Sequence, residues 1–137
     1  MKEILKTIAN HSGVFVEFNA NPNNNNTTDC VVRAIAVATE REWEDVMRDL
    51  FEFGMKHKLV FNDPDCYAMY LKELGFTKQK QPKKKNGKKY RAYEWAPKFK
   101  GIAVAHVGSH HMVAIRNGKV LDSWDSTDGI VGNYWTK

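Results

Sequence analysis

One junction constrains the fold of this chain more than any other stretch. Residues 23–29 (NNNNTTD) are polar and turn-forming, whereas residues 31–38 (VVRAIAVA) are apolar at every position except Arg33. Asn and Thr favour helix N-termini, because their side-chain oxygens accept the free backbone N–H groups. A helix that is apolar on nearly all sides has to be buried. The sequence therefore predicts a buried central helix, with Arg33 as its one solvent-facing position.

Cys30 stands at this junction, in the first turn of the predicted helix. The exposed N–H groups and the dipole at a helix N-terminus lower the pKa of a thiol and favour the thiolate. Because the thiolate is the nucleophile in cysteine chemistry, Cys30 is a candidate nucleophile. The alternative for any single cysteine is a buried packing role, which we expect for Cys66.

The composition predicts one ordered domain over residues 1–137. The N-terminus lacks the continuous apolar run of a signal peptide, and no apolar stretch is long enough to span a membrane. We therefore expect a cytoplasmic protein with reduced thiols and no membrane partner. The small size and the lack of an export signal favour a bacterial or phage source.

The net charge of +5 comes from one basic segment, residues 78–91, which holds eight Lys or Arg and no acid. The rest of the chain has 13 basic against 16 acidic residues. Asn86-Gly87 predicts a hairpin turn between polar arms at 76–85 and 88–95. Such a segment is usually a solvated loop. Its functional interpretation is binding of nucleic acid or an acidic protein by the lysines around the turn, Lys83, Lys84, Lys85, Lys88 and Lys89.

Apolar spacing predicts the remaining helices. We expect a weak helix at residues 1–9, and a helix from residue 43 to about 56 after a capping box at 39–42. A third helix begins at Pro64, which suits the first helical position, and stops at Gly75.

The second half of the chain is β-prone instead. Strands are predicted at 101–107, 111–115 and 119–122, after an early strand at 14–18. The tail, with Trp124, Tyr134 and Trp135, should fold back onto the sheet. The fold class is therefore α+β, with a mostly helical first half whose Cys-bearing helix packs on a C-terminal antiparallel sheet.

A histidine and an acid complete the set of candidate reactive groups. His111 begins one predicted strand and Asp122 ends the next, so the two can face each other across a tight turn. Cys, His and an acid together serve acyl transfer: the thiolate attacks a carbonyl, the imidazole moves the proton, and the acid orients the imidazole. Strand parity leaves His110 as an alternative base, and Asp125 is an alternative acid. Trp124 is expected to shield the pair from water, or to belong to the core.

A zinc site is the other chemistry open to these residues. Its ligands would come from Cys30, His106, His110 and His111, but no CxxC or HxxxH pair supports it. We therefore expect neither a metal nor another cofactor.

Three short motifs resemble a known superfamily. Thr28-Asp29-Cys30 before an Ala-rich helix resembles a T-D-C motif, the strand from His111 resembles a histidine strand, and Asp122-Ser123-Trp124 resembles N-S-W with Asp replacing Asn. Over residues 20–125 the chain thus resembles the papain-like cysteine peptidases, closest in style to the bacteriocin-leader (double-glycine) peptidases. The resemblance implies a papain-like fold and a thiol hydrolase with a Cys30–His111–Asp122 triad. It would cleave a peptide, isopeptide or side-chain amide bond through a thioester, and deamidases and transglutaminase-like enzymes share this constellation.

Two departures from the family pattern stand beside this resemblance. Asn24 occupies the position of a Gln whose amide binds the oxyanion, with Asn25 and Asn26 close by, and Val31 replaces a usual Gly. Losing one oxyanion donor costs about 100–1000-fold in rate. The alternative function is a non-catalytic module on the same fold that binds an anionic partner through residues 78–91.

Overall fold

Three helices follow a short first strand, as the apolar spacing predicts. The computed structural model describes residues 13–137, so the helix expected at residues 1–9 lies outside the described residues. The elements of this half are β1 (Phe15–Glu17), α1 (Cys30–Thr39), α2 (Trp43–His57) and α3 (Pro64–Glu73). Pro64 opens α3, where the Asp63 carboxylate accepts the Asp65 N–H at 2.9 Å. Gly75 follows the helix with a φ of 92°, a conformation that glycine adopts without strain.

The capping box predicted at residues 39–42 is wrong. Thr39 is the last residue of α1, and its hydroxyl donates to the Ile35 carbonyl at 2.6 Å. Glu40 adopts a left-handed φ of 56°, which ends α1, and Glu42 is the N-cap of α2. Because the N-cap of α2 is Glu42, Thr39 lies three residues too early in the chain to cap that helix.

Six strands form one sheet within residues 13–137. The later elements are β2 (Thr77–Gln79), α4 (Ala92–Trp95), the 3₁₀ turn η2 (Ala96–Lys98), β3 (Ile102–Val107), β4 (His111–Arg116), β5 (Lys119–Asp122) and β6 (Val131–Thr136). The strand order is β1-β5-β4-β3-β6-β2. All neighbouring pairs are antiparallel except β1 and β5, which are parallel. The α+β class is confirmed, but the sheet is mixed and not purely antiparallel. The strand β1 precedes the helices in the chain, so no hairpin turn connects it to β5 and requires the two strands to be antiparallel.

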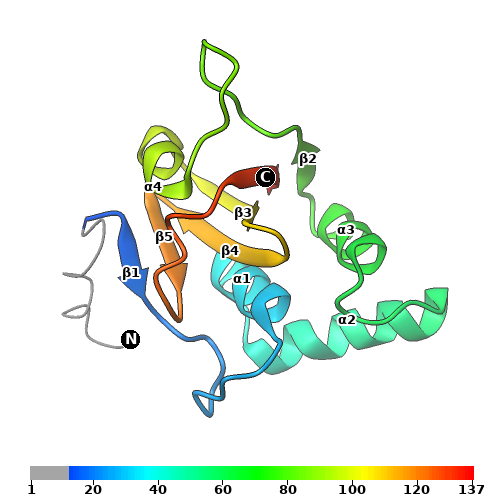
Figure 1. Cartoon of the computed structure of the whole chain (residues 1–137). Helices are drawn as coiled ribbons and strands as arrows, with labels where there is room; N and C mark the ends of the chain where they lie inside the picture. The colour runs from blue at the N-terminus through cyan, green and yellow to red at the C-terminus, as the bar shows by residue number, and fades with distance from the viewer. Residues whose placement is uncertain (1–12) are drawn as a thin grey trace.

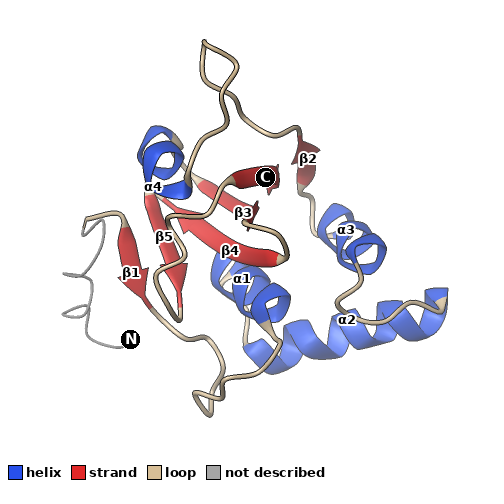
Figure 2. Cartoon of the chain, in the orientation of Figure 1, coloured by secondary structure: helices blue, strands red, loops and turns tan. Residues whose placement is uncertain are grey.

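Helices cover both faces of this sheet (Figure 2). One apolar cluster joins α1, α2 and α3 to one face, with Val32, Ile35 and Leu50 fully buried. A second cluster on the other face includes Trp95 of α4 and Ile115 of β4. The central helix α1 is buried as predicted. Its Arg33 is only 8% exposed, however, so the expected solvent-facing position is wrong.

The basic segment (residues 78–91) projects from the molecule (Figure 1). It turns at Asn86-Gly87 as predicted, with the Lys84 N–H donating to the Lys88 carbonyl at 2.8 Å, but the two expected arms do not pair along their length. A single isolated bridge joins Lys83 and Lys89, and the Gly87 N–H donates to the Lys84 carbonyl at 2.9 Å. Residues 76–85, expected to form the first arm, instead include β2, which pairs with β6. Residues 88–95, expected to form the second arm, include α4. Burial of Ala92 and Trp95 beneath the sheet outweighs strand pairing in this second arm.

The tail folds onto the sheet in part. Tyr134 and Trp135 lie in β6, with Trp135 buried, whereas Trp124 is 55% exposed. No helix among the described residues is long and apolar enough to cross a membrane, which agrees with the sequence.

Gly54 near the end of α2 provides a test of this packing. The chain turns back over the helix so closely that a Cβ at Gly54 would lie 2.3 Å from the Leu59 carbonyl oxygen. A Gly-to-Ala change inside a helix ordinarily stabilises by about 0.5–1 kcal/mol. We expect Gly54→Ala instead to lower the free energy of unfolding by about 1–3 kcal/mol, because the backbone has to move.

Urea unfolding measures this change, with Lys56→Ala as the control, because Lys56 is exposed on the same helix. The control should stay within about 0.5 kcal/mol of the wild type. An unchanged or higher midpoint for Gly54→Ala would contradict the close approach.

Candidate active site

Cys30 lies at the N-terminus of the buried helix α1. It is the first helical residue, and Asp29 is the N-cap, although the Asp29 side chain makes no capping hydrogen bond. The thiol is half-buried and lies 4.0 Å from the His110 carbonyl oxygen. The apolar helix thus holds a partly accessible thiol at the end where the helix dipole favours the thiolate.

His111 and Asp122 form a short pair, in which Asp122 is buried and His111 half-buried. His111 Nε2 lies 2.6 Å from Asp122 Oδ2, and Asp122 is 2% exposed. The antiparallel pairing of β4 with β5 brings the two residues together from the ends of adjacent strands. Because Nε2 faces Asp122, Nδ1 is the nitrogen left for a hydrogen bond with Cys30. Trp124 covers the imidazole with ring centroids 4.9 Å apart, while remaining largely exposed itself.

The surroundings of this pair favour its charged form. Burial raises the pKa of the Cys30 thiol, but hydrogen bonds with the His111 ring and the Met112 backbone bring that pKa below its ordinary value. Burial lowers the pKa of His111, but hydrogen bonds to Asp122 and Cys30 raise it to about 9. The two shifts have opposite signs, so thiolate and imidazolium stabilise each other.

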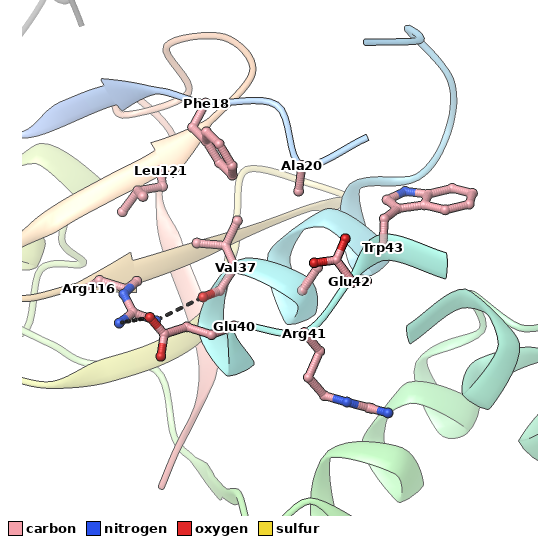
Figure 3. A pocket seen from close by; sticks show the side chains of 10 residues that line it. Phe18, Ala20, Val37, Glu40, Arg41, Glu42, Trp43, Arg116 and Leu121 are labelled. Atoms are coloured by element: carbon pink, nitrogen blue, oxygen red, sulfur yellow. Dashed lines mark hydrogen bonds and ion pairs between the residues drawn. The ribbon is translucent and has the colours of Figure 1, made fainter. Parts of the chain in front are cut away.

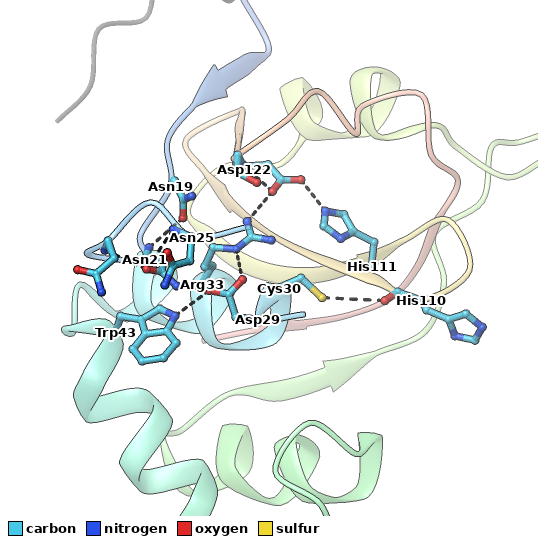
Figure 4. Close-up of polar contacts among 12 residues, drawn as sticks. Asn19, Asn21, Asn25, Asp29, Cys30, Arg33, Trp43, His110, His111 and Asp122 are labelled. Carbon is cyan, nitrogen blue, oxygen red and sulfur yellow. Dashed lines mark hydrogen bonds and ion pairs between the residues drawn. The ribbon is translucent and has the colours of Figure 1, made fainter. Parts of the chain in front are cut away.

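Arg33 connects this pair to the loop before α1 (Figure 4). Its guanidinium donates to Asp122 Oδ1 at 2.9 Å and to Asp29 Oδ1 at 2.8 Å. Asp29 Oδ2 in turn accepts from Trp43 Nε1 at 2.9 Å and Asn21 Nδ2 at 3.0 Å. Sequence reasoning missed Arg33 and Asp29 as site residues. The available signal was a single charge inside an otherwise apolar helix.

The Asp122 carboxylate also accepts from Ser126 Oγ at 2.7 Å and from the Ser123 N–H at 2.7 Å. Burial raises the pKa of Asp122, but the hydrogen bonds from His111, Ser126 and Arg33 hold it below its ordinary value. Asp122 therefore remains a carboxylate and can orient the imidazole.

The Cys30 cleft is a hollow of about 600 Å³ at this site. Its polar and reactive lining residues include Asn26, Thr28, Cys30, Tyr67, Ser109, His110 and His111. His106, considered from the sequence as a zinc ligand, also lines the cleft, and its Nε2 lies 2.6 Å from the Tyr67 hydroxyl. The sequence reasoning missed the contact between these two residues, since a strand residue and a helix residue have no local signal for it.

The structure separates the other predicted site residues. Asn26 lines the cleft, whereas Asn24 and Asn25 are exposed and do not, and Asn24 has a left-handed φ of 55°. Buried Asn21 organises this loop, because its Oδ1 accepts the Asn23 N–H at 2.9 Å. The side chain of His110 is exposed at the rim.

Asp125 is not in contact with His111. Its Oδ1 accepts the Thr127 N–H at 3.0 Å, and its buried Oδ2 has no hydrogen-bond partner among the described residues. Cys66 is fully buried, and its thiol lies 3.6 Å from the Leu50 carbonyl oxygen. Burial raises the pKa of Cys66, as expected of a packing residue.

The predicted anion-binding lysines lie on the projecting turn. Lys83, Lys85, Lys88 and Lys89 are exposed, whereas Lys84 is half-buried and pairs with Glu94 at 2.8 Å. Within residues 13–137, no cluster of three or more His, Cys, Asp or Glu is placed to hold a metal ion.

Another hollow, of about 340 Å³, lies at the far end of α1 (Figure 3). Its charged residues include Arg116, which donates to the Val37 carbonyl at 2.9 Å and lies 3.4 Å from Glu40. It contains no nucleophile, so the Cys30 cleft is the candidate active site.

Comparisons with models of known protein families, with curated proteins and with solved structures found no significant match.

The buried ion pairs of Arg33 lead to a stability prediction. Arg33→Met leaves the buried Asp29 carboxylate without a cation, and leaves buried Asp122 with the His111 imidazolium as its one cation among the contacts described. Breaking such a pair costs about 3–5 kcal/mol of unfolding free energy, because an uncompensated charge remains buried. Urea unfolding at neutral pH measures the loss.

Arg48→Met is the matched control, because Arg48 makes a largely exposed pair with Asp45 at 3.0 Å. Such pairs contribute at most about 1 kcal/mol. Equal losses in the two variants would mean that the Arg33 network carries no special stability.

Proposed function

We propose that this protein is a thiol hydrolase with a papain-like arrangement, in which Cys30 is the nucleophile, His111 the base and Asp122 the orienting acid. The observation that carries the proposal is the relay from Cys30 through His111 to Asp122, with its 2.6 Å hydrogen bond at the acid end. The order of these residues along the chain agrees with the papain-like motifs. The packing of a Cys-bearing helix on a sheet also supports the proposal.

The reaction begins with the Cys30 thiolate beside the His111 imidazolium. The sulfur attacks the carbonyl carbon of an amide, forming a C–S bond and an oxyanion. The oxyanion collapses, the C–N bond breaks, and His111 donates its proton to the leaving amine. A thioester remains on Cys30. Water attacks the thioester carbon while His111 takes the water's proton. The resulting oxyanion collapses, the C–S bond breaks, and the carboxylic acid product leaves, which restores the Cys30 thiolate and the His111 imidazolium.

The oxyanion requires hydrogen-bond donors. The first is the backbone N–H of Cys30, at the α1 N-terminus, where the dipole adds to the attraction. Asn26 is the best candidate for a side-chain donor, because it is the member of the Asn run that lines the cleft. Asn24 matches the family position in sequence, but it does not line this cleft.

The substrate bond is a peptide, isopeptide or side-chain amide. The cleft is open, so an extended polypeptide can reach Cys30 from outside. Amine acceptors in place of water would convert the same thioester chemistry into transamidation, and a side-chain amide substrate would make the enzyme a deamidase.

Thiol reactivity tests the nucleophile. Iodoacetamide should alkylate Cys30 at pH 7 at least about tenfold faster than Cys66, because only the Cys30 pKa is lowered. His111→Ala removes the hydrogen bond and the positive charge from Cys30, so its alkylation should slow and shift to higher pH. Peptide-level mass spectrometry over a pH series measures both rates.

His110→Ala is the control for this test, because the His110 side chain is exposed at the rim. Its alkylation profile should follow the wild type. Equal alkylation rates at Cys30 and Cys66 would contradict the proposal. A pH profile of Cys30 alkylation in His111→Ala that matches the wild type would also contradict it.

The charged pair also predicts the pH dependence of hydrolysis. Activity should rise as the Cys30 thiol ionises, below the ordinary thiol pKa. It should fall as the His111 imidazolium loses its proton near pH 9, since no proton is then available for the leaving amine. Fluorescently labelled casein provides a general substrate for the measurement. Activity that keeps rising above pH 9, or that survives Cys30→Ala, would count against this mechanism.

A further inference from the structure

A smaller hollow, of about 300 Å³, adjoins the Cys30 cleft. The cleft and this hollow share His106 and Ser109 as lining residues, so they meet at these positions. The smaller hollow extends to Gln81, which belongs to the basic segment. The Gln81 side chain donates to the Val131 carbonyl at 2.7 Å. A path therefore leads from Cys30 to the base of the projecting turn. We name it the groove, lined at its outer end by Gln81, His106, Gly108, Ser109, Gly132 and Asn133.

An irregularity in the sheet shapes this groove. The register of β3 against β6 shifts between Ala105 and Val107, opposite Gly132 and Asn133. Such bulges re-aim side chains and are common beside active sites. A Cβ at Gly132 would lie 3.2 Å from the His106 Cβ, so glycine allows the close approach.

The His106 ring is also fixed from the other side. Tyr67 of α3 holds its Nε2 at 2.6 Å, and the two rings meet edge-on with centroids 6.0 Å apart. The wall between the Cys30 cleft and the outer groove is therefore preformed, rather than assembled when a ligand arrives.

The charges along the groove have one sign. None of the described residues lining the cleft or the groove is Asp or Glu. Lys78 stands close to His106: its Nζ lies 5.6 Å from the centroid of the Trp135 ring, whose centroid lies 5.5 Å from that of the His106 ring. Burial lowers the pKa of His106, and the positive charge of Lys78 lowers it further. Beyond the groove stand Lys83, Lys85, Lys88 and Lys89, which are exposed and have no ion-pair partner in the described part of the chain. An extended anionic chain fits this distribution.

The aromatic residues of the basic segment favour a polypeptide over a nucleic acid. Binding to single strands relies on exposed aromatic rings among the cations, on which bases stack. Tyr90, the one aromatic residue of the segment, is half-buried beneath Lys84, whose Nζ lies 5.7 Å from the ring centroid. Tyr93 and Trp95, which follow the segment, are half-buried and buried, respectively. The exposed lysines are thus left with charge alone, which suits Asp and Glu side chains.

We infer that the substrate is an acidic polypeptide, which docks on the basic segment and runs along the groove to Cys30. The inference rests on the proposed function, because it names the substrate class of that hydrolase. In this proposal, the exposed lysines of the basic segment raise the local concentration of the acidic chain. The preformed wall at His106 then directs that chain toward the Cys30 thiol.

Binding to the Cys30→Ala protein tests the docking independently of catalysis. A fluorescein-labelled oligoglutamate should bind in low salt, as measured by anisotropy, and should bind more weakly as salt screens the charges. Lys83→Glu/Lys85→Glu should weaken binding about tenfold or more, since attraction becomes repulsion at two exposed positions. Arg48→Glu/Lys56→Glu is the matched control: it makes the same charge change on α2, away from the basic segment (Figure 1). It should bind nearly as well as the parent.

The path to Cys30 is tested by protection. Bound oligoglutamate should slow iodoacetamide alkylation of Cys30 in the wild-type protein, and should not do so in Lys83→Glu/Lys85→Glu. Absence of binding in low salt, equal loss in the control variant, or unslowed alkylation would overturn the inference. Tighter binding of an oligothymidylate of equal charge would overturn it in favour of nucleic acid.

The two proposals can fail separately. Oligoglutamate that binds and protects Cys30, in a protein that hydrolyses no amide, would leave the docking intact and remove the proposed hydrolase. Hydrolysis of casein by a protein that does not bind oligoglutamate would remove the acidic substrate alone.

Discussion

The buried carboxylate of Asp122 is the group on which both the fold and the site depend. A buried charge is costly unless it is paired and hydrogen-bonded. Asp122 accepts hydrogen bonds from His111, Arg33, Ser126 and the Ser123 backbone. Through them it joins β5 to β4, to α1 and to the loop before β6. The same contacts that offset the cost of its burial therefore fix the orientation of the His111 ring.

Arg33 has an opposing influence within this network. Its guanidinium attracts the Asp122 carboxylate and so reduces the pull of that carboxylate on the His111 proton. Its second contact holds Asp29, the residue before Cys30. One side chain in α1 thus ties the acid of the proposed triad to the helix that carries the nucleophile. A displacement of Asp29 or of Asp122 would therefore move the Arg33 guanidinium and disturb its contact with the other carboxylate.

The parts of this arrangement that could be predicted from the sequence are those encoded locally. Helical spacing predicted α2 and α3, and the tight turn after Ile115 predicted the β4–β5 pair that brings His111 to Asp122. Arg33 was misread because its partner Asp122 lies 89 residues away, and periodicity carries no information on such contacts. For the same reason the pairing of β2 with β6 and the parallel β1 were missed. The Asn run was read by sequence position, whereas its path depends on buried Asn21, a contact that only the folded loop defines.

Stability and reactivity depend on pH through the same groups. The Asp122 pKa is lowered in the folded protein, so its contribution to stability is present above the unfolded carboxyl pKa and is lost as the pH falls through the folded value. The His111 pKa is raised to about 9, so its contribution is complete below the unfolded imidazole pKa and is lost as the pH rises through about 9. Between these limits the carboxylate and the imidazolium are both charged. That is also the range in which the imidazolium lowers the pKa of Cys30, because a neutral ring provides no charge to stabilise a thiolate. The buried network around Asp122 and His111 is therefore also the one that lowers the pKa of Cys30.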